Sequence, residues 1–432
     1  MSNILFKIVY LAVVLSISLH AEIQIIKKQN SDSNTTLLVV SGIHGNEPGS
    51  YFAGSILATH YTIQSKNLWI VPNLNKDSIR DNQRGINGDM NRKFSIIGKN
   101  DKDKDTVEDI KKVILSKNVS LVLNLHDGHG FYRKDFEGNI FNPNAWGQTC
   151  VIDQCKLKED QPFGNLDEIA SQVKINVNKR LLQEHHAFNV RNTKTKYEDE
   201  QMQLSLTYFA VTNNKPAFAI ESSKNLSSLS QKVYYQLLAI EEFMKIMDIS
   251  FDKTFTLTEN SIKGIIQEYG TLEINKNISL NLSNIKKSLS YIPIKSSGNE
   301  FKFSHPLGHI KNINGLRVVY IGNKRITALK PQYFDISNEC PANIELYIDG
   351  KRSSISSAKE FYVNDDFNIV RADNLRVNVI GFTAKNVLNE SGITIHKDSL
   401  NKEFSLDTHN KMYRVEFYKG NKFCSMSVVH FK

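Results

Sequence analysis

The stretch LVVSGIHGNEPGSYFAGSI, residues 38–56, joins a strand-like apolar run to a helix-like segment. His44 and Glu47 stand on the turn between the two, beside Gly45 and Pro48. Glycine lets a backbone turn tightly, and proline suits the first turn of a helix. One rigid turn can therefore present a histidine and a carboxylate to the same metal ion. Because such pairs also occur by chance, the prediction depends on the rest of the chain.

Up to residue 250 the chain alternates strand-like and helix-like segments. The strand candidates are short apolar runs rich in β-branched residues, at residues 35–43, 67–75, 120–126 and 216–222. Helical candidates lie between them, and a long one closes the region. This alternation predicts an α/β domain with a mostly parallel or mixed sheet flanked by helices.

Polar residues follow the carboxyl ends of these predicted strands, where ligands collect in open α/β sheets. His44 and Glu47 follow the first strand, His126 ends the third, and Glu221 ends the fourth. Two imidazoles and one carboxylate form the ligand set of a catalytic zinc site, with a fourth position left for water. The sequence therefore predicts that His44, Glu47 and His126 bind one zinc ion.

A second polar cluster follows the second strand, in the segment PNLNKDSIRDNQRGINGDMNRKF, residues 72–94. Arginine recognises carboxylates through two parallel hydrogen bonds. The cluster therefore favours a carboxylate-binding site near the predicted metal. Its members are Arg80, Arg84, Asp89, Asn91 and Arg92.

Four motifs in chain order, HGNEP, NGDMNRKF, LNLHDG and AIESS, resemble those of the metallocarboxypeptidases similar to carboxypeptidase A. The resemblance covers about residues 25–250. It implies the same three zinc ligands, with Asp89 orienting His44 through the other ring nitrogen.

The resemblance also implies the remaining roles in catalysis. Arg84 would stabilise the oxyanion of the tetrahedral intermediate, and Asn91 with Arg92 would hold the terminal carboxylate of the substrate. Glu221 would be the general base that takes a proton from the zinc-bound water and passes it to the departing amine. Tyr208 is the best candidate for the tyrosine that caps the substrate in this family, with a core aromatic residue as the alternative.

A closer resemblance is to the periplasmic peptidoglycan DL-carboxypeptidases that determine cell shape in helical bacteria. The HGNEPG turn, the GDMNRKF segment, the LHDGHG turn and a β-rich C-terminal part carry it. It implies trimming of murein tripeptides to dipeptides, at the bond between the γ-carboxyl of D-glutamate and meso-diaminopimelate. Peptidoglycan muropeptides would be the substrates, and cell-shape proteins are possible partners. Some relatives carry glutamine where this chain has His44.

The chain divides into four predicted parts: residues 1–21, 22–250, 251–338 and 339–432. The first is a signal peptide, which predicts a periplasmic protein without a membrane span after cleavage, with an uncleaved membrane anchor as the alternative. The second is the catalytic domain. Alternating apolar and polar residues with Asn-Gly and Asp-Gly turns predict two small β domains after it, the last immunoglobulin-like. The net charge of +9 comes without a nucleic-acid motif, and no nucleic-acid partner is predicted.

Four cysteines follow the signal peptide, and in an exported protein an even number suggests disulfides. Their positions favour two local pairs, Cys150 with Cys155 and Cys340 with Cys424. Buried free thiols are the alternative.

Two other functions remain open at this point. An HGNE turn followed by an arginine loop also resembles the zinc deacylases of the succinylglutamate desuccinylase and aspartoacylase group, which cleave N-acyl amino acids. An inactive scaffold that binds peptidoglycan is the second alternative, and the complete set of ligands disfavours it.

Overall fold

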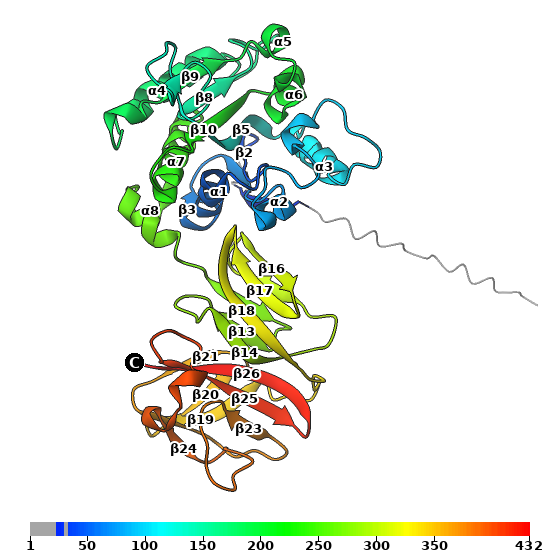
Figure 1. Ribbon diagram of the computed structural model, residues 1–432, viewed down its shortest axis with the longest axis vertical. Helices are drawn as coiled ribbons and strands as arrows, with labels where there is room; N and C mark the ends of the chain where they lie inside the picture. The colour runs from blue at the N-terminus through cyan, green and yellow to red at the C-terminus, as the bar shows by residue number, and fades with distance from the viewer. Residues whose placement is uncertain (1–22, 30–32) are drawn as a thin grey trace, which may run out of the picture.

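The computed structural model describes residues 23–29 and 33–432 and shows an α/β region followed by two β-rich regions (Figure 1). The predicted signal peptide lies outside the described residues. Among the residues that are described, no helix is long and apolar enough to cross a membrane.

The α/β region is built on a seven-stranded mixed sheet. The four central strands are mutually parallel, and β1 and β8 run antiparallel to their inner neighbours. Every residue of β2 and β4 is buried, as expected for strands covered on both faces. The order across the sheet is β1 (Ile26–Lys28), β4 (Asn67–Val71), β2 (Thr36–Val40), β5 (Val119–Gly128), β10 (Ala217–Ser223), β8 (Thr149–Ile152) and β9 (Asn189–Asn192).

Helices cover this sheet, which confirms the predicted α/β class. The long helix α7 packs against α1 and α4 on one side, while α3 and α6 contact β5 on the other (Figure 1). Pro48 occupies the first turn of α1, as its place in the sequence predicts. The helices are α1 (Pro48–His60), α2 (Lys76–Asp81), α3 (Lys104–Ile114), α4 (Leu166–Asn178), α5 (Thr195–Glu198), α6 (Leu206–Thr212), α7 (Leu229–Ile246) and α8 (Glu259–Ile265). Short 3-10 turns lie at η1 (Met90–Arg92), η2 (Glu184–His186), η3 (Met202–Leu204), η4 (Lys397–Ser399) and η5 (Lys402–Phe404).

The C-terminal part is β-rich, as predicted, although the short helix α8 and the turns η4 and η5 interrupt its strands. One four-stranded sheet contains β14 (Ser288–Ile294), β18 (Lys324–Tyr333), β17 (Leu316–Ile321) and β16 (Gly308–Ile313). A second contains β20 (Lys351–Ser356), β19 (Asn343–Ile348), β22 (Asp366–Ile369) and β24 (Thr394–His396). Two-stranded pairs elsewhere join β3 (Tyr61–Ile63) with β11 (Phe251–Lys253) and β6 (Phe131–Tyr132) with β7 (Phe141–Asn142).

A third β sheet is shared by the two predicted β domains. Its main path is β15 (Phe301–Phe303), β12 (Thr271–Ile274), β13 (Ile278–Asn281), β26 (Lys422–Phe431), β25 (Met412–Lys419) and β23 (Arg376–Val379), with β21 (Glu360–Val363) also paired to β26. Strand β13 precedes the predicted boundary at residue 338 and β26 follows it, yet the two strands pair. The boundary at residue 338 therefore stays a prediction from the sequence, because the regions on its two sides are joined in one hydrogen-bonded sheet.

The cysteines form one of the two expected disulfides. Cys340 and Cys424 are bonded, with a sequence separation of 84 positions. The predicted Cys150–Cys155 pair is wrong, because β8 buries Cys150 in the core while Cys155 lies exposed beyond the strand. Both thiols are free. Sequence spacing could not show that the first of these side chains points into the core.

The observed disulfide gives a stability prediction. Closing a loop of this length restricts the unfolded chain, and the Cys340→Ser, Cys424→Ser double variant is expected to lose about 2–4 kcal/mol of unfolding free energy. Urea unfolding monitored by circular dichroism would measure the loss. Cys155→Ser is the matched control, since that thiol is exposed and forms no disulfide. An equal effect of the control would contradict the prediction.

Candidate active site

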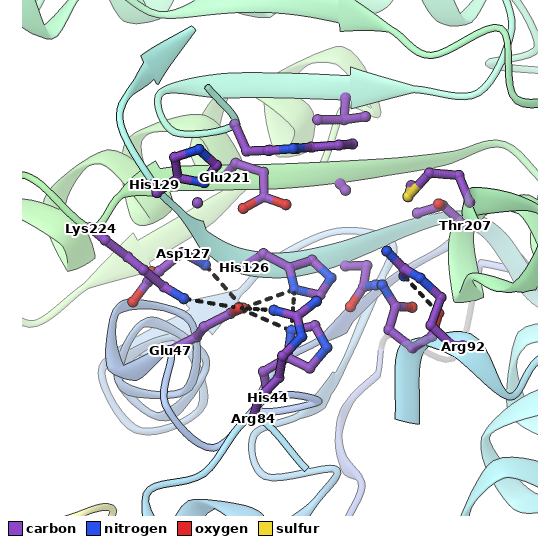
Figure 2. Close-up of a pocket in the computed structure, with 17 residues that line it drawn as sticks. His44, Glu47, Arg84, Arg92, His126, Asp127, His129, Thr207, Glu221 and Lys224 are labelled. Atoms are coloured by element: carbon purple, nitrogen blue, oxygen red, sulfur yellow. Dashed lines mark hydrogen bonds and ion pairs between the residues drawn. The ribbon is translucent and has the colours of Figure 1, made fainter. Parts of the chain in front are cut away.

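Three buried side chains, carried by the segment after β2 and by strand β5, converge on one point (Figure 2). His44 lies on the turn after β2, Glu47 is the N-cap residue of α1, and His126 lies in β5. The Nδ1 atoms of His44 and His126 are 3.0 and 2.9 Å from the two carboxylate oxygens of Glu47, and 3.2 Å from each other. The three residues that the sequence predicts as metal ligands therefore lie together in the fold.

The hydrogen bonds around His44 show why this cluster suits a cation. Its Nε2 atom lies 2.8 Å from Oδ1 of Asp89, and an ionised carboxylate can only accept a hydrogen bond. A neutral His44 therefore carries its proton on Nε2, and its Nδ1 presents a lone pair to the oxygens of Glu47. Two hydrogen-bond acceptors that face each other inside a protein repel each other, and a positive charge between them offsets this repulsion.

The pKa values of His44 and Glu47 point to the same preference for positive charge, while burial lowers the pKa of His126 and favours its neutral, metal-binding form. Burial lowers the pKa of His44, but the charge of Glu47 and the hydrogen bonds to Asp89 and Glu47 outweigh it, so the pKa is raised. Burial alone would raise the pKa of Glu47, whereas its interactions with His44 and His126 hold it well below the usual range. Two imidazole nitrogens and a carboxylate thus fit a divalent metal ion such as zinc.

Asp89 and Arg84 form a polar frame around these ligands. Asp89 caps the turn η1 by accepting a hydrogen bond from the backbone of Asn91. Arg84 donates from Nε to Asp89 at 2.9 Å and from its terminal nitrogen to Glu47 at 3.1 Å. The side chain of Arg84 is 45% exposed and lines the cavity, while these two hydrogen bonds hold it in place. These contacts fit the predicted roles of both residues.

Asn91 and Arg92 line the same cavity, which has a volume of about 270 Å³. The side-chain oxygen of Asn91 accepts a hydrogen bond from the backbone of Leu206 at 3.0 Å, which fixes the orientation of the amide. Arg92 donates to the carbonyl of Asn91 at 3.0 Å. An anchored amide and a guanidinium side by side can bind a carboxylate.

Glu221 faces the metal-ligand cluster from the neighbouring strand (Figure 2). It lies in β10 directly across from His126 in β5, because the two strands pair in parallel. Burial, together with the charges of Glu47 and Asp127, raises the pKa of Glu221 well above its usual value. A carboxyl group with a raised pKa is a stronger base than an ordinary carboxylate, as suits a general acid or base.

Two other predicted residues lie elsewhere. Tyr208 belongs to α6, but its neighbour Thr207 lines the cavity in its place. Its capping role therefore gains no support from the structure. Arg80 does not line the cavity and forms ion pairs with Asp77 and Asp81.

Sequence reasoning also missed residues that line the cavity. Lys224 lies in the turn after β10, with its Nζ atom 3.5 Å from Oε1 of Glu47. Trp146 and His129 come from the segment that follows β5. Lys224 stands three residues after Glu221, which was a usable signal. Trp146 gave none, because it reaches the cavity through an irregular segment.

Comparisons with known proteins agree with this geometry. Residues 2–267 match a family model described as the catalytic region of a carboxypeptidase controlling helical cell shape, and residues 337–432 match the C-terminal domain of a metallo-carboxypeptidase. Among solved structures, apo Csd4 and tripeptide-bound Csd4, a cell shape determinant of Helicobacter pylori, are 33% identical with a TM-score of 0.89. Each match covers 95% of this chain and 100% of the other.

A third structure, the mDAP-bound form of Helicobacter pylori Csd4, is described as a D,L-carboxypeptidase. It is 33% identical with a TM-score of 0.89, and the match covers 94% of this chain and 100% of that chain. A search of curated proteins returned no match.

The ligand geometry predicts how metal binding responds to substitution. His126→Ala removes one of three ligands and is expected to reduce bound zinc from one ion per chain to almost none. Glu221→Gln is expected to retain the ion, because Glu221 faces the cluster without belonging to it. Metal analysis after dialysis would measure both. If His126→Ala still bound a stoichiometric ion, the ligand assignment would be wrong.

Proposed function

The chain belongs to the family of carboxypeptidases that control helical cell shape, and from this premise we propose that it is a periplasmic zinc-dependent DL-carboxypeptidase. Its substrate is the peptidoglycan stem tripeptide, which it shortens to a dipeptide. The bond hydrolysed joins the γ-carboxyl of D-glutamate to meso-diaminopimelate. The observation that carries the proposal is the His44, Glu47 and His126 cluster with Glu221 across one cavity.

The chemistry divides between the metal and the residues around it. A zinc ion held by His44, Glu47 and His126 supplies a Lewis acid that polarises carbonyl groups and lowers the pKa of water. Glu221 accepts a proton from the attacking water and returns it to the amine that leaves. Because burial raises its pKa, Glu221 holds a proton more strongly than an ordinary carboxylate, which suits it to carry the proton between the two transfers.

Arg84 and Arg92 each interact with a different negative charge in the reaction. Arg84, anchored by Asp89 and Glu47, places a fixed cation where charge develops on the carbonyl oxygen. Arg92 and Asn91 bind the free carboxylate at the end of the substrate. An endopeptidase substrate lacks this group, so the pair selects for removal of a terminal residue.

The relatives support the choice of substrate. Csd4, which this chain resembles over nearly its whole length, has been solved with a tripeptide and with mDAP. No observation favours the N-acyl amino acid deacylase. The inactive scaffold conflicts with the complete site. Periplasmic location rests on the predicted signal peptide, and partner proteins for cell shape stay a prediction.

The proposed activity is tested with muropeptides. Muramyl tripeptide incubated with the zinc-loaded protein is expected to yield dipeptide and free diaminopimelate, resolved by mass spectrometry. Glu221→Gln should bind zinc normally and release neither product, because the amide cannot carry the proton. Turnover of N-succinyl or N-acetyl amino acids instead would favour the deacylase. Binding to murein sacculi without turnover would favour the scaffold.

The role of Arg92 gives a separate prediction. Arg92→Lys keeps the charge but loses the two-pronged contact, and hydrogen bonds to charged groups contribute roughly 1.5–3 kcal/mol. Its kcat/KM for tripeptide is expected to fall by about tenfold to a hundredfold, mainly through KM. Lys93→Arg is a control, since Lys93 pairs with Asp101 and Asp103 away from the cavity. An unchanged KM in Arg92→Lys would contradict the assignment.

A further inference from the structure

The turn between β17 and β18, residues 322–323, contacts the α/β region next to the site. In Figure 1 the sheet that contains these strands lies directly below α1 and α2. The side chain of Asn323 donates to Oδ1 of Asn82 at 3.1 Å. Burial raises the pKa of Tyr51, and the backbone of Asn323 lies close enough to the Tyr51 hydroxyl to oppose that rise. The turn therefore touches both helices.

Gly322 makes the closest approach in this contact. A Cβ atom at this position would lie 2.9 Å from the ring of Tyr51 and 3.3 Å from that of Phe52. Its φ of +57° is also one that glycine adopts without strain. Any side chain here would push against the first turns of α1. The fit at this point therefore depends on glycine.

The two contacted helices enclose the turn that carries the metal ligands. The hydroxyl of Tyr51, which is fully buried, lies 3.4 Å from the carbonyl oxygen of Gly45. On the other side Gly45 packs against α2 so closely that a Cβ atom would lie 1.9 Å from the carbonyl oxygen of Ser78. Gly45 is thus held between Tyr51 and the backbone of α2. Since it stands between His44 and Glu47, a shift of either helix would move both ligands.

A second contact joins the same sheet to α2. Lys311 in β16 forms an ion pair with Asp81, the last residue of α2, and this bond lowers the pKa of Asp81. Asn82, which Asn323 contacts, ends the helix in the left-handed conformation. The chain then continues to Arg84. The contacts at Asp81 and Asn82 thus lie close in sequence to a residue that reaches the cavity.

We propose that the turn at residues 322–323, with Lys311, positions the metal-binding turn of the catalytic domain. The middle β region then acts on the site through Tyr51 and through the end of α2. Metal ligands must be held within about 0.5 Å of their binding geometry, so support of this kind affects affinity and not only stability. The inference rests on the proposed function in taking zinc as the metal. It goes further in giving this β region a role in catalysis.

The test uses the full chain and two glycine substitutions. Gly322→Ala introduces a methyl group against Tyr51. Gly315→Ala is the matched control, because Gly315 also has a positive φ, +80°, in the preceding hairpin turn of the same sheet, where a Cβ would meet nothing within 4 Å. Both variants carry backbone strain, and only the first contacts the α/β region.

The expected result is a loss of zinc affinity in Gly322→Ala alone. Substitutions of residues that position metal ligands typically weaken metal binding about 10–100-fold. We expect a loss of about tenfold in zinc affinity here, measured by competition with a chelator. Hydrogen exchange over residues 43–52 should also be faster in the zinc-free variant. Gly315→Ala should match the wild type in both measurements.

A milder variant keeps the test decisive if Gly322→Ala does not fold. The Asn323→Ala, Lys311→Met double variant removes the two side-chain contacts to α2 and leaves the glycine intact. It should weaken zinc binding severalfold and increase the same exchange. If the folded variants lost thermal stability but bound zinc and exchanged like the wild type, the contact would be ordinary domain packing and the proposal would fail. Were the wild type to bind no zinc, the proposed function would fail, and exchange in the zinc-free proteins would still decide this inference.

Discussion

The structure depends on one electrostatic constraint, the burial of two imidazoles and a carboxylate whose lone pairs face one another. Without a positive charge this arrangement is costly, because the surrounding protein excludes the water that would otherwise solvate it. Asp89 sets the tautomer of His44 and thereby directs its Nδ1 lone pair toward Glu47. Arg84 contacts both carboxylates and offsets part of their charge. A metal ion between these groups would add a positive charge at the centre of the polar network.

The sheet determines which side chains can meet at this point. Parallel pairing of β2 with β5 and of β5 with β10 brings the ends of three strands together at one edge. Strand register then places Glu221 beside His126. A shift of one residue would turn either side chain to the opposite face of the sheet. The general base and the ligand are therefore positioned by the same backbone hydrogen bonds.

This dependence on strand ends explains what the sequence could and could not predict. His44, His126 and Glu221 each end a buried apolar run, so their common edge could be predicted before any coordinates. Trp146 reaches the cavity from an irregular segment, for which periodicity offers no rule. Thr207 lines the cavity and Tyr208 does not, because consecutive residues of α6 point to different faces of the helix, which the sequence alone could not orient. The pairing of β13 with β26 was equally hidden, since hairpin patterns predict neighbours in sequence and not distant partners.

That distant pairing also links the end of the chain to the site. Strand β26 pairs with β13, and the Cys340–Cys424 disulfide also attaches to β26. The hydrophobic core that includes Ile278 and Met426 continues to Ile321, beside the turn at residues 322–323. Because interiors are close-packed, displacement of one element is transmitted to its neighbours instead of being absorbed. A catalytic domain that ended at residue 250 would keep every ligand and lose the outer support of α1 and α2. The C-terminal β strands are therefore better regarded as part of the framework of the active site than as an appended binding module.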